Sequence, residues 1–380
     1  MTDVVVTGIG LTTALGPTAD VNWQRLMAGE SAIALRQPFV DLAPGPLAMM
    51  GKRPVELGWL TAQLVDTALQ DAGLENLRGE RCGVVIGSSR SHLQAWERMA
   101  IALESGDFPA HAARDWLPAL PHQPAVSAAQ RVGAEGPVLA PMAACATGVW
   151  AVAQGADLIR GGQCDRVLVG AVEAPITPLT LAGFRKMGAL AKTGCYPFDV
   201  NREGFVLGEG GALMVLEAAA GAKARGAKVY GKVLAAGITN DGHHVSSFDP
   251  SYAMGHRALE ICLRRSGLLP QAIDAAHVHG TSTAQNDRME ASLIERWLPA
   301  GVPVMATKGA TGHTLGASGA LIVALSLLSL REQELASCVG LGEAAFDLNF
   351  VRAGQQAKIE KMLCFSFGFG GQNAVLALSS

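Results

Sequence analysis

The sequence predicts an α/β fold in which helices cover β-sheets, and three observations support it. Short apolar segments typical of buried strands alternate with longer segments of helical period, and glycines cluster at the junctions between them. Of the 380 residues, 49% are hydrophobic and only 17% are charged, which suits a large buried core and argues against disorder. Two pairs of segments far apart in the chain also echo each other in the same order, which indicates a repeated topology.

The expected elements follow from the period of the apolar residues. Strands are expected at residues 4–7, 82–86, 138–141 and 167–172, and helices at residues 57–72 and 144–160. Gly73 and Gly161 come directly after the two helices, where glycine commonly ends a helix. Strands and helices that alternate in this way predict layers of helix against sheet.

The internal echo divides the chain into two halves. The echoing pairs are residues 84–89 (VVIGSS) with 277–282 (HVHGTS), and residues 137–140 (PVLA) with 303–306 (PVMA). Chance is the alternative explanation for such short apolar segments, but two echoes in matching order weaken it. We therefore expect two halves of one topology, residues 1–218 and 219–380, packed as one body because no Pro/Ser-rich linker separates them.

Composition excludes several classes of function. A net charge of −3 offers no general reason to bind nucleic acid. The seven cysteines contain no C-x-x-C pair, which argues against a disulfide framework or a zinc site, and no metal is expected. No basic and apolar leader opens the chain, and the longest apolar stretch, residues 317–330, is read as too short to span a bilayer. A cytoplasmic protein without a membrane partner is expected.

Cys145 lies where a strand is predicted to give way to a helix, among the small residues of the segment MAACATG. Unpaired N–H groups and the helix dipole at such a place would lower the pKa of a thiol and favour the nucleophilic thiolate. The same N–H groups could hold an oxyanion formed from a thioester. The alternative, which this segment alone favours, is a buried cysteine that only packs.

Two histidines and a lysine occupy comparable positions in the second half. His279 and His313 each follow a predicted strand inside a polar or glycine-rich segment, and Lys308 lies five residues before His313. Each histidine alone is more often structural, and a lysine is usually a solvated surface residue. Together they are read as a convergent pair, with a cation that would keep a neighbouring imidazole neutral.

The order Cys145, His279, Lys308 and His313 resembles that of the β-ketoacyl-acyl carrier protein synthases, the elongating condensing enzymes of the thiolase superfamily. Further motifs extend the resemblance over nearly the whole chain. They are VVVTGIG at 4–10, ACATG at 144–148, NREGFVLGEG at 201–210, HGTST at 279–283 and SFGFGG at 366–371. The resemblance implies a thiolase-like fold with α-β-α-β-α layers.

It also implies a 3-oxoacyl-[acyl-carrier-protein] synthase that works by decarboxylative Claisen condensation in fatty acid or related polyketide elongation. By resemblance, Cys145 carries an acyl group as a thioester, and the backbone N–H groups of Cys145 and Phe369 form the oxyanion hole. By the same resemblance, Phe369 would also gate the site. His279 and His313 would assist decarboxylation of the malonyl group and stabilise the enolate, and Lys308 would organise this half of the site.

The resemblance further supplies substrate contacts and partners. Thr281 and Thr283 would line the phosphopantetheine arm, with Phe367 and Phe369 as further substrate contacts. Acyl- and malonyl-loaded carrier protein and a second copy of the chain are the implied partners, and no cofactor is implied. Because carrier protein is acidic, a basic patch is expected at the mouth of the site. The candidate residues are Arg185, Lys186 and Arg202.

Several departures from the family pattern keep alternatives open. The family usually has a glutamate where Ile322 stands and a threonine where Gln372 stands. Residues 88–127, which in the family help to build the dimer contact and the acyl pocket, look compact and unusual here. A specialised polyketide or polyene synthase is one alternative, and a non-catalytic chain-length partner subunit is a weaker one because such partners generally lose the cysteine. A thiolase with Cys364 as second catalytic cysteine is disfavoured, because its apolar neighbours suit a buried strand.

Overall fold

The computed structural model describes residues 2–106 and 116–380, and within them ten strands form one continuous hydrogen-bonded order, β10-β9-β13-β14-β8-β1-β7-β6-β4-β5. The strands of the first half are β1 Val4–Thr13, β4 Cys82–Gly87, β5 Val138–Leu139, β6 Arg166–Glu173 and β7 Gly210–Ala218. Those of the second half are β8 Gly231–Asn240, β9 Ala275–His277, β10 Val304–Met305, β13 Lys361–Gly368 and β14 Gln372–Ser379. Two small sheets pair β2 Ala34–Arg36 with β3 Gly45–Leu47, and β11 Glu334–Leu335 with β12 Gln355–Gln356.

Helices cover both faces of these strands. The α-helices are α1 Ala19–Met27, α2 Leu57–Ala72, α3 Leu93–Glu104, α5 Gln123–Val132, α6 Thr147–Arg160, α7 Pro178–Lys186, α8 Ala219–Ala224, α9 Ala253–Ser266, α10 Ala284–Trp297, α11 Lys308–Thr311 and α12 Ser318–Glu332. Short 3₁₀ helices lie at η1 Leu117–Ala119, η2 Pro270–Ala272 and η3 Leu315–Ala317.

The two groups of five strands have the same topology. In each, the second strand pairs in parallel with the third and fourth, and the fifth pairs antiparallel with the fourth and first. The segments that echo each other in sequence therefore occupy equivalent strands, β4 with β9 and β5 with β10. The groups join where β1 pairs with β8.

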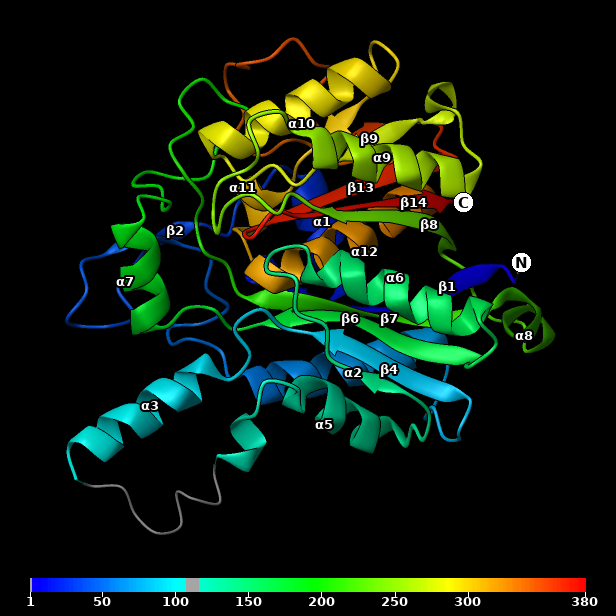
Figure 1. Ribbon diagram of the computed structural model, residues 1–380, viewed down its shortest axis with the longest axis horizontal. Coiled ribbons are helices and arrows are strands. Elements are labelled where there is room, and N and C mark those ends of the chain that lie inside the picture. The colour runs from blue at the N-terminus through cyan, green and yellow to red at the C-terminus, as the bar shows by residue number, and fades with distance from the viewer. Residues whose placement is uncertain (1, 107–115) are drawn as a thin grey trace.

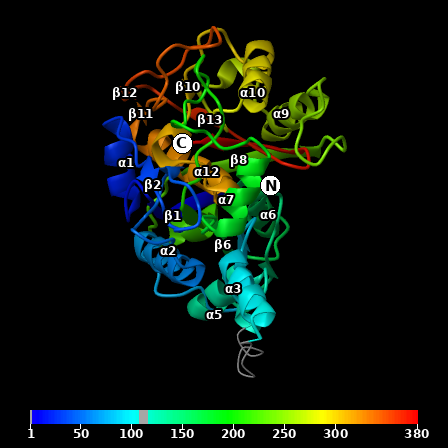
Figure 2. The same ribbon diagram turned by 90° about the vertical axis from the view of Figure 1, so that its left-hand side faces the viewer.

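Figure 1 shows the resulting five layers. Helices α9 and α10 cover the second group of five strands, α2 and α5 cover the first group, and α6 and α12 lie between the two groups. The predicted α/β layering is confirmed. Figure 2, turned by 90°, shows α3 and α7 on the side of the molecule that faces the viewer.

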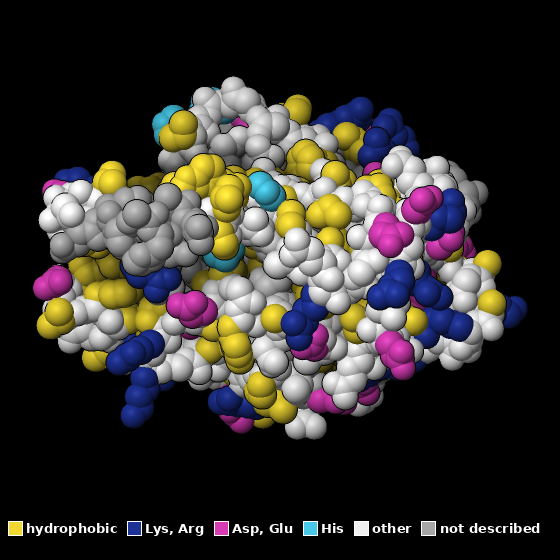
Figure 3. Space-filling model, turned by 90° about the horizontal axis from the view of Figure 1, so that it is seen from below, with side chains coloured by type: hydrophobic (Ala, Val, Ile, Leu, Met, Phe, Trp, Pro, Cys, Tyr) yellow, Lys and Arg dark blue, Asp and Glu magenta, His cyan; other side chains and the backbone are white. Residues whose placement is uncertain are grey.

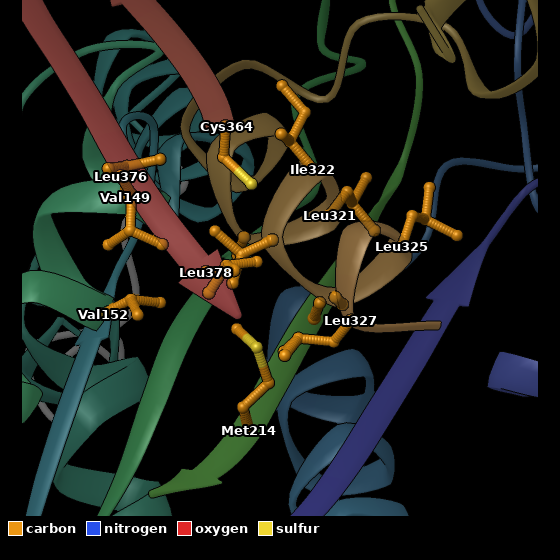
Figure 4. Close-up of a cluster of buried hydrophobic side chains, with 14 of the residues drawn as sticks. Val149, Val152, Met214, Leu321, Ile322, Leu325, Leu327, Cys364, Leu376 and Leu378 are labelled. Atoms are coloured by element: carbon orange, nitrogen blue, oxygen red, sulfur yellow. The ribbon is translucent and has the colours of Figure 1, made fainter. Parts of the chain in front are cut away.

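The central layer holds the main apolar core. Val149 and Val152 of α6 and Leu327 of α12 form one cluster of buried side chains there with strand residues such as Met214 and Leu376 (Figure 4). The helical segment Leu315–Glu332 is long and apolar enough to cross a membrane by length and composition, contrary to our expectation, but 89% of it is buried inside the protein. Its apolar character is accounted for by this core position.

Strand β1 runs well beyond the predicted residues 4–7 because the glycines that follow do not end it. A Cβ at Gly8 would lie 2.5 Å from the carbonyl oxygen of Ala68, and one at Gly10 would lie 2.3 Å from that of Leu64. Both contacts are with α2, so the glycines allow this helix to pack directly on the strand. The glycines that were expected to end the strand instead form the surface on which α2 packs.

Candidate active site

Three reactive side chains meet in one place. The sulfur of Cys145 and one ring nitrogen from each of His279 and His313 all lie within 4.8 Å of one another. Cys145 lies before α6, His279 follows β9, and His313 follows β10 and α11, so both halves contribute. The imidazole centroids are 5.2 Å apart, with the rings nearly perpendicular.

The nucleophile lies on a tight turn rather than inside a helix. Helix α6 begins at Thr147, three residues later than predicted, and Ala144 has a left-handed φ of 46°. The Ala146 N–H donates to the carbonyl of Ala143, which closes the turn. Gly368 permits this geometry, because a Cβ there would lie 2.9 Å from both the Ala143 oxygen and the Cys145 nitrogen.

Burial governs the protonation of Cys145. It raises the pKa of the thiol to about 11, and the charges of Lys308 and Arg90 together with the Phe369 N–H oppose this only in part. The sequence-based expectation of a lowered pKa is therefore wrong for the resting site, because the two charges and the Phe369 N–H stabilise the thiolate less than desolvation destabilises it. The sulfur rests as a thiol and needs a substrate to take its proton.

The charge of Lys308 acts on both histidines. Its Nζ donates to Nδ1 of His279 at 3.3 Å and also to the His279 carbonyl oxygen. Burial, and next the charge of Lys308, hold the pKa values of His279 and His313 well below the usual range. Both rings are neutral, as expected. Burial also lowers the pKa of Lys308 to about 8, against the attraction of Glu290.

Two supporting residues were not anticipated from the sequence. Glu290 on α10 accepts the backbone N–H groups of His279 and Gly280 at 2.6 Å each, and burial raises its pKa to about 8. Ser318 at the start of α12 lies 2.7 Å from Nδ1 of His313. The sequence hinted at Glu290 only indirectly. Thr283 caps α10, and Glu290 lies on the buried face of that helix.

A cavity of about 350 Å³ leads to the reactive centre. Thr281, Thr283, Phe367 and Phe369 all line it, together with Cys145 and both histidines. The hydroxyls of Thr281 and Thr283 lie 2.9 Å apart, and they line a passage that has both polar and apolar walls. Such a channel suits a long flexible arm with amide groups.

The three basic residues expected at the mouth of the site differ in their exposure. Arg202 has a side chain only 10% exposed and lies over the ring of Phe346, so it is not available at the mouth. Arg185 and Lys186 are exposed on α7, and Met187, directly after them, lines the cavity. The structure thus places two of the three candidates near the opening.

The departures from the family pattern are also located. Ile322 is 1% exposed inside the apolar core on α12, so no carboxylate stands there beside Lys308. Gln372 begins β14 and is half-buried. The donor atoms of Cys145 and the two histidines could approach one metal ion, but the adjacent Lys308 ammonium repels a cation.

Comparison with known proteins agrees over the whole chain. Residues 58–222 match the family described as Beta-ketoacyl synthase, N-terminal domain, and residues 230–341 match Beta-ketoacyl synthase, C-terminal domain. The 3-oxoacyl-[acyl-carrier-protein] synthase 2 of Vibrio cholerae is 34% identical, with 98% of each chain covered. That of Synechocystis sp. is 32% identical, covering 98% of this chain and 97% of the relative.

Solved structures are similar along their full length. One is a chain of a complex described as a type II PKS acyl-carrier protein in complex with its ketosynthase bound to the hexaketide. That chain has a TM-score of 0.94 and 25% identity, and the match covers 100% of this chain and 99% of that one. A β-ketoacyl synthase from Burkholderia phymatum has a TM-score of 0.91 and 27% identity, with coverage of 100% and 99%.

Proposed function

The chain belongs to the β-ketoacyl synthase family, and we propose that it is a 3-oxoacyl-[acyl-carrier-protein] synthase whose nucleophile is Cys145. One observation carries the assignment of the residues: a thiol, two neutral imidazoles and an ammonium group converge at the end of one cavity. This is the set that an acyl-enzyme followed by enolate chemistry requires.

In the first step, the Cys145 sulfur attacks the thioester carbonyl of an acyl-carrier protein. The N–H groups of Cys145 and Phe369 face the developing oxyanion, as Gly368 allows the two segments to approach. The bond to the carrier sulfur breaks, the acyl group stays on Cys145, and the thiol proton leaves on the carrier thiol. A thiol with a raised pKa suits this exchange, because proton and acyl group change places between two sulfurs.

In the second step, malonyl-carrier protein enters and loses CO2. The electron pair left behind becomes an enolate, and its oxygen accepts N–H groups from His279 and His313. Because Lys308 donates to Nδ1 of His279, the proton of that ring lies on Nε2. The enolate carbon then attacks the acyl carbonyl on Cys145, and the released sulfur takes a proton from water.

The test is reconstitution with purified carrier protein. Acyl groups of increasing length, from acetyl upward, are offered on carrier protein, and the mass of the Cys145 peptide is recorded before and after malonyl-carrier protein is added. We expect an adduct on Cys145 that disappears as a 3-oxoacyl-carrier protein and CO2 form. An adduct on another cysteine, or no condensation product with any acyl group, would refute the proposal.

The same survey distinguishes fatty acid elongation from specialised polyketide synthesis. The second function is supported by the likeness to the ketosynthase bound to a hexaketide. Preference for saturated acyl groups supports the first function, and preference for oxidised or polyunsaturated chains supports the second. A non-catalytic chain-length partner is disfavoured because Cys145 is retained beside both histidines.

We also propose that the protein forms a homodimer and lies in the cytoplasm. Each chain is proposed to consist of two similar halves, residues 1–218 and 219–380. Strand β5, at one end of the strand order, is open to solvent, with Val138 and Leu139 each 39% exposed. An exposed apolar edge strand is a natural site for pairing with a second copy. Figure 3 shows further hydrophobic side chains at the end of the molecule that carries α3, where Trp96 and Ile101 are exposed. Analytical ultracentrifugation tests the proposed dimer: a monomer at micromolar concentration would refute it.

A further inference from the structure

His277 is a buried histidine to which the mechanism above assigns no role. It ends β9 two residues before His279, and none of its surface is exposed. Burial, and next the charge of Lys308, lower its pKa to about 3, so the ring stays neutral throughout the working range. Because the imidazole of His277 is neutral, it cannot form an ion pair with a charged neighbour. Any role of this ring must therefore come from its hydrogen bonds.

Both ring nitrogens of His277 are engaged. Nδ1 lies 3.0 Å from the hydroxyl of Ser326, and Nε2 lies 3.1 Å from the hydroxyl of Thr307. Ser326 donates its only hydroxyl proton to the Ile322 carbonyl at 2.8 Å, so it can only accept from His277. The proton of the ring therefore lies on Nδ1, and Nε2 accepts the hydroxyl proton of Thr307.

The bond to Thr307 fixes the segment that presents Lys308. Thr307 occupies the N-cap position of α11, yet its side chain makes no capping bond and turns to His277 instead. Lys308 follows directly and donates to His279. His277 and His279, two residues apart at the end of β9, thus hold the adjacent residues Thr307 and Lys308 at the start of α11.

The surroundings of this link are apolar on the α12 side. Ile322 and Cys364 lie next to each other in the core (Figure 4), and the Cys364 thiol donates to Ser326 at 3.3 Å. Within residues 2–106 and 116–380, Lys308 makes no ion pair within 4.0 Å. Its position therefore depends on hydrogen bonds and on the backbone that carries it, while Glu290 attracts it without a direct ion pair.

We propose that His277 is a positioning residue: through Thr307 it sets the place of the Lys308 ammonium against His279, and so the decarboxylation step. The inference rests on the proposed function. It specifies that the contact with Thr307 matters more than the contact with Ser326, because only Thr307 adjoins the lysine.

Two amide variants separate these contacts. The amide of asparagine reaches the place of Nδ1, and that of glutamine reaches the place of Nε2. His277→Gln should therefore keep a partner for Thr307, whereas His277→Asn should not. Thr307→Val removes the hydroxyl with little change of shape and leaves His277 in place. Ser329→Ala, a buried change on the same helix as Ser326, is the control because Ser329 does not contact His277.

The measurement is CO2 release from malonyl-carrier protein by enzyme already acylated, per Cys145 acylated as counted by mass spectrometry. Counting only acylated sites removes losses due to misfolding. We expect His277→Asn and Thr307→Val to lose about tenfold, and His277→Gln and Ser329→Ala to stay within about threefold of wild type. Unchanged rates in both Asn and Val variants overturn the inference. A wild-type enzyme that releases no CO2 overturns the proposed function, and this inference with it.

Discussion

The side-chain nitrogen of Lys308 lies 3.3 Å from Nδ1 of His279 and also donates to the carbonyl of that residue. One ammonium group thereby fixes both the ring and the backbone of a histidine at the end of β9. Because the donor occupies Nδ1, the ring N–H that faces the cavity is Nε2–H, the form that can stabilise an enolate.

Replacement of Cys145 by alanine should separate the two steps. Without a sulfur the enzyme cannot be acylated, but His279, His313 and Lys308 remain to decarboxylate malonyl-carrier protein. We expect no detectable acyl adduct by mass spectrometry and measurable CO2 release. Acylation that persists in Cys145→Ala would show that the nucleophile is elsewhere.

His279→Ala and His313→Ala should have the opposite effect. Each removes one N–H donor to the enolate, and loss of such a donor costs about 100-fold in rate. We expect condensation to fall by about this factor in each variant, while acylation of Cys145 falls much less. Either variant condensing at the wild-type rate would remove that histidine from the mechanism.

The pH dependence of decarboxylation should follow Lys308. Burial lowers its pKa to about 8, so the ammonium donor exists below this pH and is lost as the pH rises through it. CO2 release by acylated enzyme should therefore decline above pH 8. Lys308→Met should be slow and should lack the part of this decline that belongs to the lysine, while Glu290, whose pKa burial raises to about 8, still titrates. A wild-type rate that rises through this range would contradict the role of the charged lysine.

Gly368→Ala should disturb the nucleophile turn. The added Cβ would lie 2.9 Å from the Cys145 nitrogen, so the oxyanion hole must shift. We expect acylation to slow by about 100-fold while the protein remains folded. Gly183→Ala, on α7 with no atom within 4 Å of the new Cβ, is the matched control. Equal acylation rates in the two variants would show that close approach of Gly368 is unimportant.

Ser318→Ala tests the second histidine. The Ser318 hydroxyl, 2.7 Å from Nδ1 of His313, can hold the proton of this ring on Nε2. Without it we expect a mixture of tautomers, visible in ¹⁵N spectra of labelled histidine, and about a tenfold loss in decarboxylation. An unchanged spectrum would mean that another group sets the tautomer.

Local pattern was a good guide to the elements. Helix α2 has the bounds that its apolar period predicted, Leu57–Ala72, because its spacing and the following Gly73 are local properties. The length of strand β1 was underestimated, because the glycines at its centre pack against a helix more than fifty residues away in sequence. The order of motifs also identified Cys145, His279 and His313 as candidates.

What the sequence by itself determined is which residues can react and at which element ends they lie. Only the tertiary structure decided that Cys145 lies within 4.8 Å of both histidines, that its pKa is raised rather than lowered, and that Ser318, Glu290 and His277 support the site. The physical reason is that burial and electrostatic interaction depend on groups brought together from distant parts of the chain. No local pattern records the distance between them.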